Sequence, residues 1–134
     1  MAAKQYDFSI EQGSSFRLSL TYKDANDAII DLTGYCARLT LKVSNNEYKV
    51  FTTLNNDYSE YKFVIDAAQG GLTLLLPAST TNNYTFSNAK YDLELQSPVD
   101  LYNGGGKQTI RVLYGTISIV KRFSQSTTLL DCTI

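Results

Sequence analysis

The chain has 134 residues, the length of a single domain, with 43% hydrophobic and 19% charged side chains. Its 12 basic and 13 acidic side chains give a formal net charge of −1, which argues against a nucleic-acid partner because phosphate binding needs an excess of positive charge. No apolar run approaches the roughly 20 residues of a membrane span, and residues 1–7 lack the apolar core of a secretory signal. We therefore expect no membrane partner and a chain made in the cytoplasm.

The N-terminal segments alternate between apolar and polar residues, the pattern of a strand with one face in a core and one face in water. A first short strand is predicted at residues 5–10 and is followed by a turn at 11–14. The clearest alternation lies at 15–23, and the turn-forming residues 24–27 follow it. The apolar stretch 29–34 is then typical of a connection that crosses between two sheets.

The middle of the chain repeats the same alternation in shorter segments. Strands are predicted at residues 35–44, 48–54, 61–65 and 72–76. The alternation breaks at Pro77, where one helical turn near residues 78–82 is predicted, with the proline at or near its start.

Two further strands are predicted before the C-terminal segment. The first begins at residue 91 and ends at Pro98, and the loop 99–107 follows it. The last strand, at 110–119, changes which residues are apolar partway along, and a bulge or bend at Gly115 would reconcile its two halves.

Seven or eight short strands with regularly spaced turns predict an all-β fold, an antiparallel sandwich of two sheets. This sandwich is expected to occupy residues 1–122, with residues 123–134 as a C-terminal extension. Tyr91, near the start of the penultimate strand, is a candidate tyrosine corner, although a plain core tyrosine would give the same pattern.

Few residues are of the types that take part in catalysis or metal binding. The chain has no histidine, the commonest general base and a frequent metal ligand. Asp92 and Glu94 share a strand face, which is more typical of a solvated face than of an acid–base pair. Cys36 lies two residues from Arg38, but reduced thiols without a catalytic role are expected at Cys36 and Cys132, since two cysteines are too few for a disulfide scaffold. We expect no catalytic residue, cofactor or metal, and thus no enzyme.

Three other clusters also have an ordinary interpretation. Residues 104–107 (Gly-Gly-Gly-Lys) lack the spacing of a phosphate-binding loop and predict a mobile hairpin tip. Asp24, Asn26 and Asp27 offer oxygen ligands but not the spacing of a calcium loop, so a simple turn is favoured. The basic side chains near the end of the last strand could meet an acidic partner but are more typical of ordinary surface: Arg111, Lys121 and Arg122.

Four blocks of the sequence resemble a known family. Residues 6–16 (YDFSIEQGSSF) are similar to the start of small immunoglobulin-like virion proteins of tailed bacteriophages, and residues 30–39 (IDLTGYCARL) resemble a crossover and strand of the same family. Residues 91–97 (YDLELQS) and 113–119 (LYGTISI) resemble two later strands. The block at residues 30–39 is the most specific of the four. The chain differs from the family after the last strand, because residues 123–134 extend beyond the point where family members usually end.

The resemblance implies an immunoglobulin-like sandwich that serves as a structural part of a phage particle, in the tail, baseplate, neck or fibre-attachment region. A virion location, assembly in the host cytoplasm, and a homo-oligomer or ring with other virion proteins as partners would follow. The family brings no catalytic residues.

Docking in such a particle would use strand edges, the loop 99–107 and the two termini. The apolar C-terminal residues Leu129, Leu130 and Ile134 either fold back onto the domain or dock on a neighbouring subunit. The candidate docking residues are Tyr102, Gly104, Gly105, Lys107, Phe123, Leu129, Leu130 and Ile134.

Two alternatives remain open. A capsid decoration (cement) protein would have the same sequence features. A carbohydrate-binding module for host recognition would instead present exposed aromatic side chains, for which Tyr48, Tyr58, Tyr84 and Tyr102, in or beside loops, are candidates.

Overall fold

The computed structural model describes residues 3–54, 60–100, 106–123, 129–130 and 132. β-strands make up most of its regular structure. The strands are β1 (Lys4–Gln5), β2 (Phe8–Glu11), β3 (Phe16–Thr21), β4 (Cys36–Lys42), β5 (Tyr48–Thr52), β6 (Lys62–Asp66), β7 (Gly71–Leu76), β8 (Asn88–Asp100) and β9 (Lys107–Val120). The helical elements are the short 3-10 turn η1 (Ala67–Gln69) and the single α-helical turn α1 (Ala78–Thr81).

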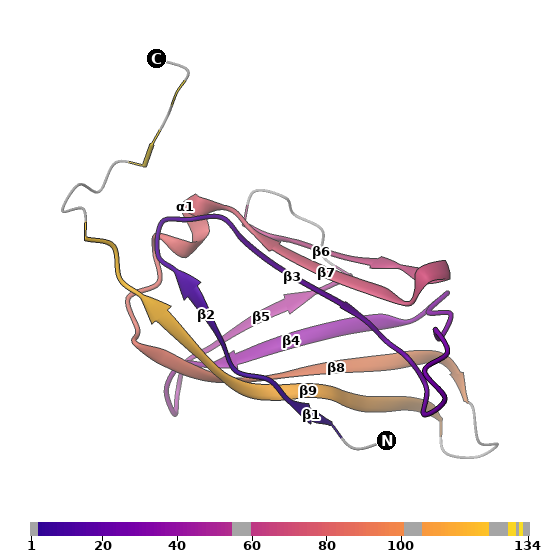
Figure 1. Cartoon of the computed structure of the whole chain (residues 1–134). Helices are drawn as coiled ribbons and strands as arrows, with labels where there is room; N and C mark the ends of the chain where they lie inside the picture. The colour runs from indigo at the N-terminus through magenta and orange to yellow at the C-terminus, as the bar shows by residue number, and fades with distance from the viewer. Residues whose placement is uncertain (1–2, 55–59, 101–105, 124–128, 131, 133–134) are drawn as a thin grey trace.

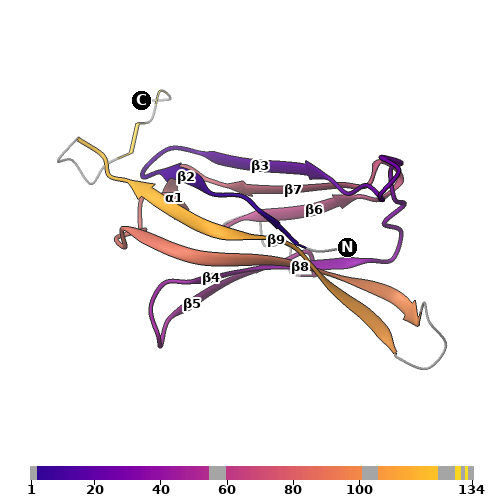
Figure 2. The same cartoon turned by 60° about the horizontal axis from the view of Figure 1, so that its bottom comes forward.

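The strands form two sheets that lie one above the other (Figures 1 and 2). The larger sheet has the order β1-β9-β8-β4-β5, and β2 also pairs with β9. The smaller sheet has the order β3-β7-β6 and forms the upper layer in Figure 1. The expectation of an all-β fold with two sheets is confirmed. The far ends of β8 and β9 bend away from the smaller sheet (Figure 2).

The core lies between the sheets and follows the alternation in the sequence. In β4, the buried side chains are Ala37, Leu39 and Leu41, and exposed or half-buried residues separate them. Buried residues of the smaller sheet, among them Phe63 and Leu72, belong to the same hydrophobic cluster. Each fully buried leucine or phenylalanine contributes about 1.5–3 kcal/mol relative to an exposed one, so this cluster is the main source of stability.

The structure divides the expected first strand into β1 and β2, which gives nine strands in the described residues instead of seven or eight. The chain breaks the ladder at Tyr6 and Asp7, where the Asp7 carboxylate accepts a hydrogen bond from the Thr116 N–H (2.9 Å). The expectation of a purely antiparallel fold is wrong for both segments, since β1 and β2 lie parallel to β9. No tight turn joins β1 or β2 to β9, because these strands are far apart in the sequence. The pairs can therefore be parallel or antiparallel.

Tyr91 is not a tyrosine corner. Its hydroxyl donates a hydrogen bond to the carbonyl of Tyr6, 85 residues away along the chain, whereas a tyrosine corner bonds to backbone a few residues upstream. The side chain is buried and its ring meets that of Phe8 edge to face. Tyr91 therefore fastens the N-terminal break to the larger sheet.

The change of apolar face in β9 is present, but it does not lie at Gly115. The pairing shifts so that Leu93 lies opposite Leu113 and Glu94 opposite Arg111, which leaves Val112 as the extra residue. Gly115 serves a different need, because a Cβ at this position would lie 2.6 Å from the Asp7 carboxylate and even closer to the Tyr6 carbonyl. The glycine lets the N-terminal segment approach β9.

The helical turn predicted after Pro77 is confirmed as α1, with Pro77 directly before it. The prediction that Pro98 ends its strand is wrong, because β8 continues to Asp100. Pro98 lies where the pairing shifts between Gln96 and Asp100, so its missing N–H breaks no regular ladder bond. The Ser97 hydroxyl accepts the Gln108 N–H in this stretch (2.8 Å).

Candidate docking surfaces

Two of the predicted docking residues that the structure describes, Lys107 and Phe123, lie at opposite ends of β9 (Figure 1). Lys107 is exposed and begins the strand, opposite Asp100. Phe123 follows the end of the strand, so 14 strand residues, roughly 45 Å of extended chain, separate the two groups. Lys107 and Phe123 therefore do not form one site within a single copy. Tyr102, Gly104, Gly105 and Ile134 lie outside the described residues.

The C-terminal candidates are uncovered where the structure describes them. Phe123 is 100% exposed and Leu130 is 89% exposed, whereas Leu129 is half-buried. Large apolar side chains so exposed are typical of surfaces that contact a partner. Of the expected extension 123–134, only these three residues and Cys132 are described, and none lies in a strand.

The chain leaves the sandwich at a fixed point just before Phe123. The Arg122 N–H donates to the Gln12 side-chain oxygen (3.1 Å), and its guanidinium donates to the Asn82 side-chain oxygen (2.8 Å). The Lys121 ammonium donates to the carbonyl of Phe86 (3.0 Å). Lys121 and Arg122 therefore make hydrogen bonds within the domain. This agrees with the interpretation of the basic cluster as ordinary surface rather than a site for an acidic partner.

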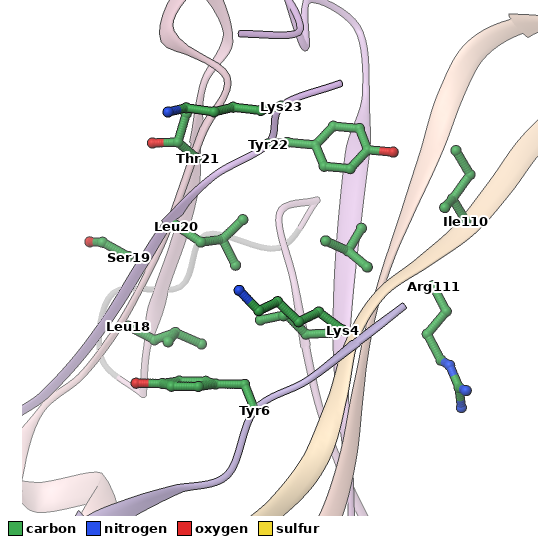
Figure 3. A pocket seen from close by; sticks show the side chains of 12 residues that line it. Lys4, Tyr6, Leu18, Ser19, Leu20, Thr21, Tyr22, Lys23, Ile110 and Arg111 are labelled. Carbon is green, nitrogen blue, oxygen red and sulfur yellow. The ribbon is translucent and has the colours of Figure 1, made fainter. Parts of the chain in front are cut away.

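A groove of about 460 Å³ lies between β3 and the β1–β9 pair, on a side of the sandwich for which the sequence indicated no site (Figure 3). Leu18 and Leu20 of β3 point into it, and the side chains of Lys4 and Tyr6 enter it from the opposite wall. The β3 leucines pack against the core cluster but are only half-buried, so the second sheet covers them incompletely. Alternation identified their core-facing side but could not show that the cover is incomplete.

The backbone of β3 is open beside this groove. The Tyr22 N–H donates to the Gly70 carbonyl at the end of β7 (2.8 Å), and in an antiparallel pair the residues that bond to the neighbour alternate with residues that face away. The N–H and C=O groups of Arg17, Ser19 and Thr21 therefore face away from β7. No described strand pairs with β3 on that side.

The rim of the groove is basic. Figure 3 shows the Lys4 ammonium within the groove, whereas the Arg111 side chain points away from it. Arg17 and Lys23 lie on the outer face of the β3 segment; Lys23 pairs with Asp27 at 3.5 Å, and Arg17 bonds to the Ser19 hydroxyl (3.1 Å). Within the described chain, neither Lys4 nor Arg17 forms an ion pair.

The outer face of the larger sheet carries mixed charge. The Arg38 guanidinium lies 2.7 Å from the Glu94 carboxylate, and this hydrogen bond raises the pKa of Arg38. Partial burial, followed by repulsion from Glu94, raises the pKa of Asp92. Arg111 stacks over the ring of Tyr114, with its guanidinium carbon 4.6 Å from the ring centre. The two carboxylates thus belong to a network of surface charges.

The most specific block of the resemblance builds a turn between the sheets. The Asp31 carboxylate accepts bonds from the Thr33 N–H (2.9 Å) and hydroxyl (2.6 Å), which lower the pKa of Asp31. Leu32 is 0% exposed, and its N–H donates to the Ala67 carbonyl (2.9 Å). Gly34 has a φ of +81°, which favours glycine. These residues hold the connection between β3 and β4 in place.

The aspartates at 24–27 also shape the backbone. The N–H groups of Asn26 and Ala28 donate to the Asp24 carboxylate at 2.8 and 3.0 Å, which is the expected turn. In the described part of the chain, no three residues of the histidine, cysteine or acidic type form a group that could hold a metal ion. Cys36 and Cys132 are both free thiols.

Of the two candidate platform tyrosines that the structure describes, one is exposed and one is buried. Tyr48 is 53% exposed on β5, but the expectation of an exposed ring is wrong for Tyr84, which is 4% exposed. Burial raises the pKa of Tyr84 to about 12, and Phe86 packs against its ring. Tyr58 and Tyr102 lie outside the described residues.

Comparison of the chain with models of known protein families and with curated proteins finds no match. Among the described residues, no helix has the length and apolarity to cross a membrane.

Proposed function

We propose that this chain is a non-enzymatic structural component of a tailed-phage virion, assembled in the host cytoplasm, which acts by docking onto other virion proteins. The resemblance of residues 30–39 carries the proposal, because it falls on residues that build the junction between the two sheets. A chain that shares this junction is expected to share the architecture of the family.

The strand order supports an immunoglobulin-like topology as part of this proposal. The order β3-β7-β6 in one sheet and β9-β8-β4-β5 in the other corresponds to the second, fifth and fourth strands facing the seventh, sixth and third in an immunoglobulin sandwich, with one added edge strand. The N-terminal strands differ from the simplest form, since both β1 and β2 lie on β9.

The surfaces support docking better than catalysis. The polar groups that looked reactive in the sequence take part in turns or surface ion pairs. Two of the most exposed large apolar side chains, Phe123 and Leu130, lie in the C-terminal segment, and half-buried leucines line the β3 groove. An open strand edge and an exposed apolar segment are two recurrent means of protein–protein recognition.

The test is a mass-spectrometric inventory of purified phage particles, combined with electron microscopy of particles labelled with an antibody against the chain. We expect the polypeptide in every particle at a fixed copy number, with label on the tail, baseplate or neck. Label spread over the head would replace this location by the capsid decoration role. Absence of the polypeptide from purified particles would overturn the proposal.

A glycan-binding screen tests the remaining alternative. The proposal predicts no saturable binding at millimolar glycan, since only one of the two described candidate rings is exposed. Saturable binding that Tyr48→Ala abolishes would favour a carbohydrate-binding module instead.

A further inference from the structure

We propose that the open edge of β3 binds the C-terminal segment 129–134 of a second copy of this chain as an added strand. The inference rests on the docking role proposed above and names the partner and the geometry of the contact.

The edge of β3 has the length and the backbone groups to accept one more strand. β3 has six residues, and Arg17, Ser19 and Thr21 direct their N–H and C=O groups away from β7. An unpaired edge with free backbone groups is a template for another extended chain. Segment 129–134 also has six residues, so it matches the edge in length.

The side chains of the segment match both faces of that edge. In an extended segment 129–134, Leu130, Cys132 and Ile134 share one face, which would cover the groove beside Leu18 and Leu20. The other face carries Asp131, next to the outer row of β3 that holds Arg17 and Lys23. Asp131 is the only charged side chain of the segment, and its sign is opposite to that of the charges on the edge.

A second copy supplies the segment because its described residues lie outside the strands of their own sandwich and include the exposed Leu130. Phe123 and Leu130 are 100% and 89% exposed. Both views place the described end of the chain beyond the arrowhead of β9 (Figures 1 and 2), whereas residues 110–113, in the first half of that strand, line the groove. Arg122 holds the exit point, and residues 123–128 between it and the segment span at most about 20 Å, so the segment can reach a sandwich packed close to its own.

Disulfide trapping in the full chain tests this arrangement. In a Cys36→Ser, Cys132→Ser background, Thr133→Cys is combined in turn with Arg17→Cys, Ser19→Cys or Thr21→Cys. Thr133 shares the Asp131 face of the segment, so its thiol would lie beside the outer row of β3. Mild oxidation, a non-reducing gel and mass spectrometry of the linked peptides identify each disulfide.

We expect at least one of the three pairs to give an intermolecular disulfide, with at least about tenfold more linked dimer than the matched control, because a disulfide needs Cα atoms within about 7 Å and docking raises the local thiol concentration. The control combines Thr133→Cys with Ser118→Cys, an exposed serine on a strand of the larger sheet. Melting temperatures near that of the background chain show that each variant is folded.

Three results would overturn the inference. A disulfide within one chain would show that the segment covers its own domain. Dimers from Ser19→Cys without Thr133→Cys would show that two β3 edges pair directly. Linkage at the level of the control for all three pairs would show that no segment docks there.

A second measurement uses the chain without added cysteines. Sedimentation velocity of wild type and Leu130→Asp should show self-association at least about tenfold weaker in the variant, since a buried leucine is replaced by a charge. Unchanged self-association would contradict the inference. If purified particles contain the chain but no disulfide is trapped, only this inference is overturned. If the disulfide is trapped but purified particles lack the chain, only the virion role is overturned.

Discussion

The two strands that border the groove, β9 and β3, have opposite surroundings. β9 is covered by β1 and β2, which continue its sheet and add the bonds from Tyr91 and Asp7. β3 has a neighbour on one side only in the described chain. One polypeptide therefore shields one edge with its own N-terminus and leaves the facing edge exposed.

This difference indicates how the two edges can be used. A β-sandwich avoids aggregation by covering or interrupting its edges, and the N-terminal segment does this for β9. An edge that stays open beside an apolar groove is a liability unless a partner covers it. The contrast locates the candidate docking edge better than overall charge or composition does.

The largest expected effect comes from a matched pair of proline substitutions at exposed serines. Ser118 of β9 pairs with Ser9 on one side and Asn88 on the other, so Ser118→Pro removes an inner ladder bond and should lower the free energy of unfolding by about 3 kcal/mol. Ser19→Pro removes only an outward-facing N–H and should cost about 1 kcal/mol or less. Urea denaturation measures both values.

Equal losses at the two serines would contradict the comparison, since they would mean that β3 is as fully paired as β9. Ser19→Ala and Ser118→Ala are the controls for loss of the hydroxyl groups. The Ser19 hydroxyl contacts the hydroxyl of Thr73, and its loss at this exposed site should change stability by less than about 0.5 kcal/mol.

The next effect concerns the cover of β9. Gly115→Val places a side chain where the Tyr6 carbonyl and the Asp7 carboxylate lie, and overpacking of this kind should cost about 2–3 kcal/mol. Hydrogen exchange should show faster exchange of the Tyr6 N–H, which bonds to the Tyr114 carbonyl. Thr109→Val, at an exposed site of the same strand, is the control. Unchanged exchange at Tyr6 would show that the cover does not depend on Gly115.

Alternation in the sequence could predict most of the strands, because burial of every second residue leaves a direct pattern. It placed the core face of β4 and β8 correctly. It could not place the extra residue at Val112, since a shift in pairing depends on the neighbouring strand as well as on the strand itself. It also could not detect that Tyr6 and Asp7 divide the first strand, because the bonds that hold the break come from Tyr91 and Thr116.

The docking surface was harder to predict than the fold. The sequence indicated apolar residues in the tail but left open whether they fold back onto the domain or dock on a neighbour; the structure shows Phe123 and Leu130 uncovered. It gave no sign of the β3 groove, because Leu18 and Leu20 alternate like core residues whether or not the facing sheet covers them. A sequence pattern reports which face is apolar, and only the arrangement of strands reports which edge lacks a neighbour.

A smaller effect is expected from the hydroxyl that fastens the covered edge. Tyr91→Phe removes the bond to the Tyr6 carbonyl and should cost about 1 kcal/mol at neutral pH. Burial, together with the nearby Asp7, raises the pKa of Tyr91 to about 12 from an ordinary value of 10.0. The neutral hydroxyl thus stabilises the fold fully below pH 10, and this contribution is lost as the pH rises from 10 toward 12.

The measurement is urea denaturation of wild type and Tyr91→Phe between pH 9 and 11.5. The variant should lose stability less steeply than the wild type above pH 10. Part of the slope remains in the variant because burial also raises the pKa of Tyr84 to about 12. Equal slopes for wild type and Tyr91→Phe would show that the N-terminal cover leaves the Tyr91 hydroxyl accessible to water.

The smallest effect is expected on the outer face of the larger sheet, which serves as a comparison for the two edges. A double-mutant cycle with Arg38→Met and Glu94→Gln should give a coupling of about 0.5 kcal/mol, which falls in 1 M salt, because the Arg38 side chain of this pair is largely exposed. Glu94→Gln should also lower the pKa of Asp92, since repulsion from Glu94 helps to raise it, and carbon-detected NMR titration measures that shift. A coupling above about 2 kcal/mol that resists salt would mean that the pair is shielded from water. In that case the outer face is covered in the associated protein, and β3 is not the main docking surface.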